Sequence, residues 1–247
     1  MKRTSYLIIS VLFCLLFASC HNSFNLRGHS NKHIVNPKGI VTTRTIKVSD
    51  FNSIRTLNGV TVVLTEGEKG SVLVEADENY QTHIDVRVNG GELTVGLKPD
   101  FSYRNGHIKV YVPAAGVNVF KASSSADIIA ETPIVSPQIT IDLSSSSKMI
   151  AVVESGKVII KAGSSADLTL SGNADIVEID ASSSADVNCD KLIAKRVFCD
   201  ASSSSDVFVF ANDELRIDAS SSSNVSYSGA VTNVFINTSS SADVYPR

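Results

Sequence analysis

Apolar residues occupy every second position in seven similar stretches of the second half of the chain. A period of two is the signature of a strand with one buried face, and the content of β-branched residues and Ser argues against helix. Counted from the first residue of each serine tract, apolar residues stand two and four positions before it and six positions after it. The last of these columns holds Ile128, Met149, Leu168, Val187, Val207, Val225 and Val244.

The serine tracts recur at a nearly constant period. Successive spacings are 21, 19, 19, 20, 18 and 19 residues. One such unit cannot bury its apolar row alone, whereas stacked units can, so the period predicts a solenoid. We expect each unit to contain a strand, a serine corner, a second strand and a second turn. The tracts begin at Ala122, Leu143, Ala162, Ala181, Ala201, Ala219 and Thr238.

The preceding region, residues 41–113, has short alternating strands such as "GVTVVLTEG" and "HIKVYVP". The segments "NGG" at Asn89 and "RNG" at Arg104 are hairpin signals. The end of a solenoid exposes unpaired strand N–H and C=O groups that can pair with other chains, so we expect other residues to cover it. The sequence therefore predicts an all-β fold: a β-solenoid (β-helix) of about seven coils over residues 114–247, with an N-terminal antiparallel β region covering the first coil.

The first residues have the features of an export signal. Lys2 and Arg3 precede the apolar run "YLIISVLFCLLFA", which is shorter than the ~20 residues that span a bilayer. The segment "LFASC" resembles the lipobox of bacterial lipoproteins and makes Cys20 the expected lipidation site. We expect a lipoprotein signal peptide over residues 1–19 and a tether over residues 20–40; an ordinary signal peptide or anchor is the alternative. The expected location is the outer membrane, at its periplasmic face or at the cell surface.

Charge is distributed unevenly. From Ala122 onward there are 8 Lys and Arg against 16 Asp and Glu, a net charge of −8. An acidic repeat region argues against nucleic acid and anionic lipid headgroups as partners.

The stretch "DFNSIRTLNGVTVVLTEGEKGSVLVEADENYQTHIDVRVNGGELTVGL", the segment "IKVYVPAAGVNVFKASSSADI" and the repeats carry a family resemblance. Together they resemble the head GIN domain family of putative autotransporter adhesins, common among Bacteroidetes envelope proteins. The family usually has a Gly-rich corner, where this chain has Ser or Ala and keeps Gly163. The resemblance implies a lipoprotein or secreted β-solenoid and transfers no catalytic residue.

Two interpretations fit the polar columns beside the corners. A carboxylate stripe would bind Ca²⁺ or a sugar, because calcium takes six to eight oxygen ligands. Alternatively, the carboxylates accept backbone N–H bonds at a turn while Ser hydroxyls bond along the stack, which the absence of the Gly-rich calcium repeat favours. The stripe comprises Asp127, Asp167, Asp186, Asp206 and Asp243, and the serine corner is represented by Ser124, Ser125, Ser183, Ser184, Ser203 and Ser204.

Catalytic chemistry is not expected. A catalytic site breaks the repeat symmetry, whereas these Asp residues obey it, and the repeat region has no His. We expect no cofactor and no metal site, and Cys189 and Cys199 are expected inside the core, where a disulfide between coils remains open. The predicted function is a non-catalytic envelope binding module, anchored to the membrane by its lipid, with a glycan or an envelope protein as ligand and oligomers left open. The alternatives are an envelope structural or stress-sensing component and a carbohydrate-active β-helix enzyme.

Overall fold

The structure, a computed structural model, describes residues 33–103 and 106–247. Within these ranges the chain forms strands almost throughout, with one short 3-10 helix, η1 (Gln81–His83). No helix in the described residues has the length and hydropathy needed to cross a bilayer. The expected signal peptide and the expected lipidation residue Cys20 lie outside the described residues.

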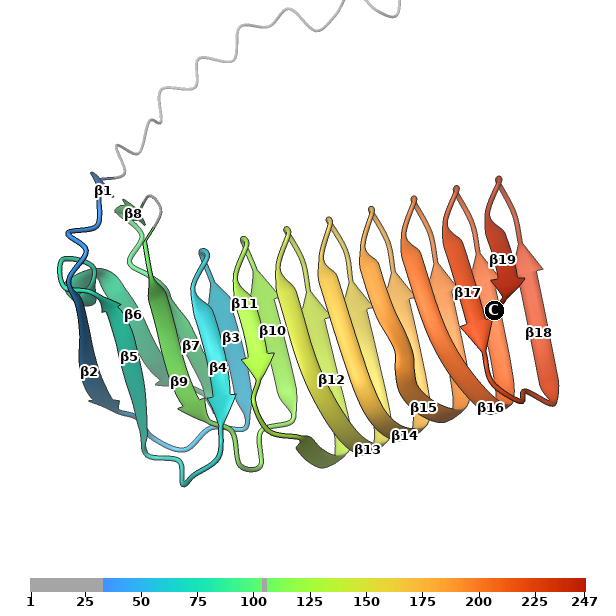
Figure 1. Ribbon diagram of the computed structural model, residues 1–247, viewed down its shortest axis with the longest axis horizontal. Coiled ribbons are helices and arrows are strands. Elements are labelled where there is room, and N and C mark those ends of the chain that lie inside the picture. The colour runs from blue at the N-terminus through green and yellow to red at the C-terminus, as the bar shows by residue number, and fades with distance from the viewer. Residues whose placement is uncertain (1–32, 104–105) are drawn as a thin grey trace, which may run out of the picture. The chain divides into compact units, whose positions relative to one another are not determined.

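The repeat region forms a stack of parallel coils (Figure 1). Each strand pairs in parallel with the strand one coil further along, and the ladder runs from β10 to β19. The β-solenoid of about seven coils expected from the repeat is confirmed. Its strands are β10 (Val119–Ser123), β11 (Asp127–Ala130), β12 (Ile134–Leu143), β13 (Lys148–Ala162), β14 (Asp167–Ala181), β15 (Asp186–Ala201), β16 (Asp206–Ala219), β17 (Asn224–Ser228), β18 (Asn233–Thr238) and β19 (Asp243–Pro246).

The register of this ladder aligns like side chains in the interior. Ile141, Ile160, Ile179, Cys199 and Ile217 are direct partners in successive coils, and none is more than 3% exposed. Burying one such aliphatic side chain contributes about 1.5–3 kcal/mol. The alternation seen in the sequence therefore becomes a continuous apolar core along the stack.

Each serine corner is a type I′ turn. At one corner, Ser183 and Ser184 have φ of 53° and 60°, and the Ala185 N–H donates to the Ser182 carbonyl at 3.2 Å. Two consecutive residues with positive φ, closed by such a bond, define this turn type. All seven serine pairs have φ between 52° and 62°. The expected corner residues Ser124, Ser125, Ser183, Ser184, Ser203 and Ser204 occupy these two positions.

The left-handed conformation is strained for a serine, by about 1–2 kcal/mol per residue. The neighbouring coil holds it in place, because the Ser184 N–H donates to the Ser203 carbonyl at 3.0 Å. The same bond recurs along the stack, for example from Ser165 to Ser183 at 2.9 Å. The corners are therefore stable only as members of the stack.

The second bend of the coil differs from the expected turn. Strands β13, β14, β15 and β16 run through it without a break. Residues of β13 and β14 stay in register from Lys148↔Asp167 to Ala162↔Ala181, so neighbouring coils keep pairing around the bend. Gly172, with φ of +109°, stands on this bend opposite Val153. Between β13 and β14, the polar residues that suggested a turn thus line a curved, paired strand. The pairing of β14 with β15 and of β15 with β16 shifts in register near the bend, and the first and last bends separate β11 from β12 and β17 from β18.

The N-terminal region contains the expected antiparallel pairs, β2–β5, β5–β9 and β6–β7. They form the end of the sheet opposite β19 (Figure 1). The strands are β1 (His33–Val35), β2 (Val41–Lys47), β3 (Ser53–Leu57), β4 (Thr61–Thr65), β5 (Ser71–Asp77), β6 (Ile84–Asn89), β7 (Glu92–Leu97), β8 (Phe101–Tyr103) and β9 (Ile108–Pro113).

The same region also supplies one more coil of the solenoid. Strands β3 and β4 pair in parallel with β10 and β11 on one side and with β7 and β9 on the other. Asn58 and Gly59, with φ of 61° and 69°, form their corner, and the Gly59 N–H donates to the Ser124 carbonyl at 2.9 Å. The chain thus forms this coil first, with β3 and β4. It then forms the cap and returns to the solenoid at β10, on the side of this coil that lies opposite β7 and β9.

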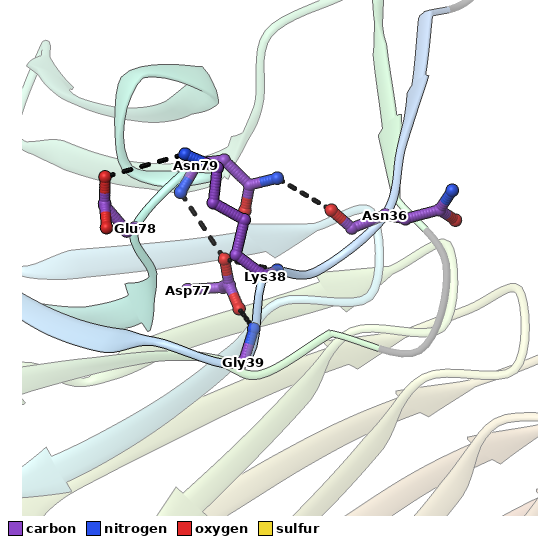
Figure 2. Close-up of polar contacts among 6 residues, drawn as sticks. All are labelled: Asn36, Lys38, Gly39, Asp77, Glu78 and Asn79. Atoms are coloured by element: carbon purple, nitrogen blue, oxygen red, sulfur yellow. Dashed lines mark hydrogen bonds and ion pairs between the residues drawn. The ribbon is translucent and has the colours of Figure 1, made fainter.

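Residues 36–40, which fall in the range expected to be a tether, are bound to the cap through Asp77 (Figure 2). The Asp77 carboxylate accepts the N–H of Lys38 at 3.0 Å and of Gly39 at 2.7 Å. Burial opposes ionisation of this carboxyl, but its backbone donors outweigh that effect, so its pKa lies below the ordinary value. Asn79 adds a bond from its Nδ2 to the Asn36 carbonyl at 2.7 Å.

Gly172→Ala tests the close approach of neighbouring coils at the bend. A Cβ at this position would lie 2.1 Å from the Val153 carbonyl oxygen. We expect a loss of at least ~2 kcal/mol in the free energy of unfolding, measured by urea denaturation. Gly90→Ala is the matched control, because Gly90 also has positive φ but its Cβ would have no neighbour within 4 Å; we expect a loss of about 1 kcal/mol. Equal losses would contradict the close approach.

Candidate functional site

The serine hydroxyls that form hydrogen bonds along the stack come from a different column of the repeat than the two corner serines. Ser147, Ser205 and Ser223 are buried, and each donates its hydroxyl to a main-chain carbonyl of the preceding coil. The acceptors are Ala122, Ala181 and Ala201, at 2.9, 3.2 and 3.0 Å. The corner serines at positive φ are instead exposed at the tips of the coils. The inward serines therefore have a structural role.

The proposed carboxylate stripe is one outward column of directly paired residues, in the order Asp127, Lys148, Asp167, Asp186, Asp206, Asn224 and Asp243. Its two exceptions relieve charge repulsion. Lys148 Nζ lies 2.8 Å from Asp167 Oδ2, and Asn224 Nδ2 donates to Asp206 Oδ1 at 2.8 Å. Burial, followed by the charges of Asp167 and Asp206, raises the pKa of Asp186. In residues 33–103 and 106–247, no group of three or more His, Cys, Asp or Glu is arranged to hold a metal ion.

A second carboxylate column flanks the corners on the other side. Asp180, Asp200 and Asp218 are direct partners in three successive coils, followed by Asn237. Burial, then the charges of Asp218 and Asp180, raises the pKa of Asp200. Asn237 Nδ2 donates to Asp218 Oδ1 at 3.1 Å, so an amide fits this column. The stacked carboxylates thus repel one another at neutral pH.

Asp200→Asn tests this repulsion. A carboxyl with a raised pKa in the folded state favours folding when protonated, and that contribution is lost as pH rises from the unfolded pKa through the folded pKa. We therefore expect the variant to be more stable than the parent at pH 7, by up to ~1 kcal/mol, and the difference to vanish near pH 3.5. Thermal unfolding at both pH values measures it. Asp100→Asn, in the exposed segment after β7, is the control and should change little; a destabilised Asp200→Asn would refute the repulsion.

The two described cysteines lie inward on β15 and are free thiols. Cys189 and Cys199 are 2% and 3% exposed. Burial raises the pKa of Cys189 to about 12 and also raises the pKa of Cys199. Because the thiolate is the reactive form, both residues act as small apolar side chains.

We expect neither thiol to react in the folded protein. Iodoacetamide at pH 8, followed by site-resolved mass spectrometry, should leave Cys189 and Cys199 unmodified in buffer and label both in urea. Labelling in urea that requires a reductant would reveal a disulfide and contradict the free thiols.

His83, at the end of η1, and His107, just before β9, make local contacts in the cap. The His83 ring stacks on Phe101 with 4.2 Å between centroids, and His107 Nε2 lies 2.6 Å from Glu75 Oε1. These contacts give both rings structural partners.

An outward row of apolar residues crosses from the cap into the solenoid. We call Leu73, Tyr111, Val63, Ile129 and Ile150 the apolar row; each is the direct register partner of the next, on β5, β9, β4, β11 and β13. Ile129 and Ile150 are 37% and 40% exposed. Leu73 is 39% exposed, but Val63, in the middle of the row, is buried. The exposed part of the row on the solenoid is therefore the neighbouring pair Ile129 and Ile150, and exposed apolar neighbours of this kind are typical of a contact surface.

The apolar row ends at Ile150, after which the same outward column first carries polar residues. The next two residues in this column are Thr169 and Asn188. Val152, 41% exposed on β13, has Ser171 as its partner in the following coil. Further along the column, Arg247 lies over the Phe208 ring at 5.1 Å, whereas Tyr245 is 46% exposed. The sequence does not reveal the row, because neighbouring members of the row come from non-consecutive strands.

A groove of about 400 Å³ lies at the C-terminal ends of β4, β9 and β11. Its lining comes from the residues that follow these strands, within 64–67, 114–117 and 132–135. Leu64, Val117 and Ile134 are buried in its floor, whereas Val135 is 72% exposed. The sequence gives no sign of the groove, since its three sides are far apart along the chain.

The fold and this surface define a capped parallel β-solenoid with an apolar contact face. The chain belongs to the family described as putative auto-transporter adhesin, head GIN domain, which matches residues 50–230. The resemblance recognised in the sequence is thereby confirmed. A search of curated proteins finds no match.

Several solved structures are similar. A putative adhesin from Bacteroides fragilis NCTC 9343 is 18% identical with a TM-score of 0.79, over 86% of this chain and 100% of that one. A putative adhesin from Parabacteroides merdae ATCC 43184 is 20% identical, TM-score 0.69, over 87% and 99%. A putative lipid binding protein from Parabacteroides distasonis ATCC 8503 is 19% identical, TM-score 0.70, over 86% and 99%. At these identities the likeness shows the fold alone.

Proposed function

We propose that the protein is a non-catalytic, adhesin-like binding module of the cell envelope, which contacts its partner through the apolar row and the adjoining groove. The observation that carries this proposal is the exposure of Ile129 and Ile150 in a column where the next coils have Thr169 and Asn188. A solvated sheet face normally carries polar side chains outward, so apolar ones in register indicate a surface that is covered in use.

The same proposal includes an anchor. Lipid on Cys20 would hold the module on the outer membrane, since each buried CH2 of an acyl chain contributes ~0.8 kcal/mol. The adhesin-like family supports an envelope or surface location. The partner on the apolar face is an envelope protein or a glycan, and the acidic repeat disfavours nucleic acid.

A catalytic role has less support. The serine pairs recur at every corner of the repeat, and most coils have a carboxylate at the same position beside them, whereas catalytic groups need one irregular cluster. The alternative of a purely structural envelope component would leave the apolar row without a partner. One neighbour's description as a putative lipid binding protein makes lipid the competing ligand class for the same face.

The double substitution Ile129→Thr/Ile150→Thr tests the proposal, because Thr already occupies the next position of this column as Thr169. We expect binding of the immobilised full-length protein to envelope fractions of the producing cells to weaken at least tenfold, since the loss of aliphatic burial exceeds ~1.4 kcal/mol. Biolayer interferometry measures it, with protease-treated and glycosidase-treated fractions to separate protein from glycan.

Ile193→Thr is the matched control, since Ile193 is equally exposed but lies on β15, away from the row. Its binding should equal that of the parent. Equal binding by the double variant, or none by the parent, would refute the proposed function.

A further inference from the structure

The groove occupies the place of a missing strand segment. In the regular coils, the bend is paired on both sides: Val153–Ser155 has β12 on one side and β14 on the other. The corresponding bend at Ile134–Ser136 pairs with β13 alone, and within the described residues no strand pairs with its other side. The residues after β9 form a turn there instead of a strand. The Ala114 N–H donates to the Thr65 carbonyl at 3.1 Å, and the Val117 N–H donates to the Ala114 carbonyl at 3.0 Å.

The main chain at the groove is directed into it. The Glu131 N–H donates to the Leu64 carbonyl of the preceding coil at 3.1 Å. On the neighbouring strand, the Lys148 N–H donates to the Ala126 carbonyl of the preceding coil at 3.1 Å. Since β13 is extended from Lys148, Glu154 also faces β12, and its register partner Val135 therefore directs its own N–H and C=O to the opposite side, which is the side of the groove. Pro133 has no N–H, so Val135 offers the donor there. The groove therefore has a polar main-chain wall above its apolar floor.

Acidic side chains surround the groove. Glu66 is part of its lining, Glu131 stands just before Thr132, and Glu154 is the register partner of Val135. One cation, Lys69, lies beside the groove, with its Nζ 4.0 Å from the position of a Cβ on Gly116. Its charge is offset by Asp50 at 2.8 Å, and it also donates to the Phe51 carbonyl at 2.5 Å. The mouth is thus complementary to a basic partner.

We propose that the groove binds an extended, basic and apolar segment of a partner polypeptide, which lies parallel to β12 and completes the interrupted ladder beside Val135. This is strand addition to a sheet edge, in which main-chain bonds give affinity and alternate side chains fill the pocket. This inference rests on the proposed function and specifies the class of partner that the groove binds. It continues the parallel ladder that already joins every pair of coils.

Other occupants fit less well. An acyl chain would fill the apolar floor but would bring no donor or acceptor for the Val135 main chain. A second copy would need about 800 Å² of surface per partner for a stable interface, and a groove of about 400 Å³ is at the small end of ligand sites. A single extended segment matches both its size and its main-chain wall.

The test uses the full-length protein and the fluorescein-labelled peptide Lys-Val-Thr-Val-Lys-Val, followed by fluorescence anisotropy. An otherwise identical peptide with N-methylated valines keeps charge and apolar content but loses main-chain donors. We expect the parent peptide to bind and the methylated one to bind at least tenfold more weakly. Ala115→Trp should fill the groove from its exposed rim and weaken binding at least tenfold, whereas Ile193→Thr should have no effect.

Glu66→Gln should weaken binding about threefold and reduce its dependence on salt. Equal binding of the two peptides, unchanged binding by Ala115→Trp, or no binding at millimolar peptide would overturn the inference. Binding of phosphatidylethanolamine vesicles that Ala115→Trp abolishes, without peptide binding, would assign the groove to lipid instead. If the peptide fails while Ile129→Thr/Ile150→Thr still weakens envelope binding, the inference fails and the proposed function stands.

Discussion

The parallel main-chain ladder between coils is the interaction on which the rest of this structure depends. It holds fourteen serines in a left-handed conformation that they would not keep alone, as the bond from Ser184 to Ser203 illustrates. It also carries the strands around the second bend without a turn, where Gly172 is required by the approach of the Val153 carbonyl. Local preferences are thus subordinate to pairing with the adjacent coil.

Repetition also has an electrostatic cost. A column that repeats every coil brings carboxylates of neighbouring coils together, and burial, followed by these neighbouring charges, raises the pKa values of Asp186 and Asp200. The chain offsets this cost by breaking the column with a cation or an amide, at Lys148, Asn224 and Asn237. These substitutions reduce the repulsion within the columns through direct side-chain contacts, so the arrangement of the columns can be explained without a bound ion.

Much of the fold could be predicted from sequence, because the period of the serine tracts and the alternation around them each encode a local rule. The extra coil at Asn58–Gly59 could not, although Asn-Gly is a strong type I′ signal: its partner Ser124 is far along the chain, and nothing local announces that pairing. The apolar row and the groove could not be predicted from the sequence for the same reason. Both depend on β4, β9 and β11 lying side by side, a consequence of the chain leaving and re-entering the stack.

The interrupted chain path has a consequence for how this architecture can vary. The coils after β13 pair only with their neighbours and share one corner geometry, so a whole unit inserted or removed among them would leave the cap, the apolar row and the groove unchanged. The length of the stack and the chemistry of its capped end are therefore independent variables. A chain of this fold can gain or lose coils without any change to its capped end.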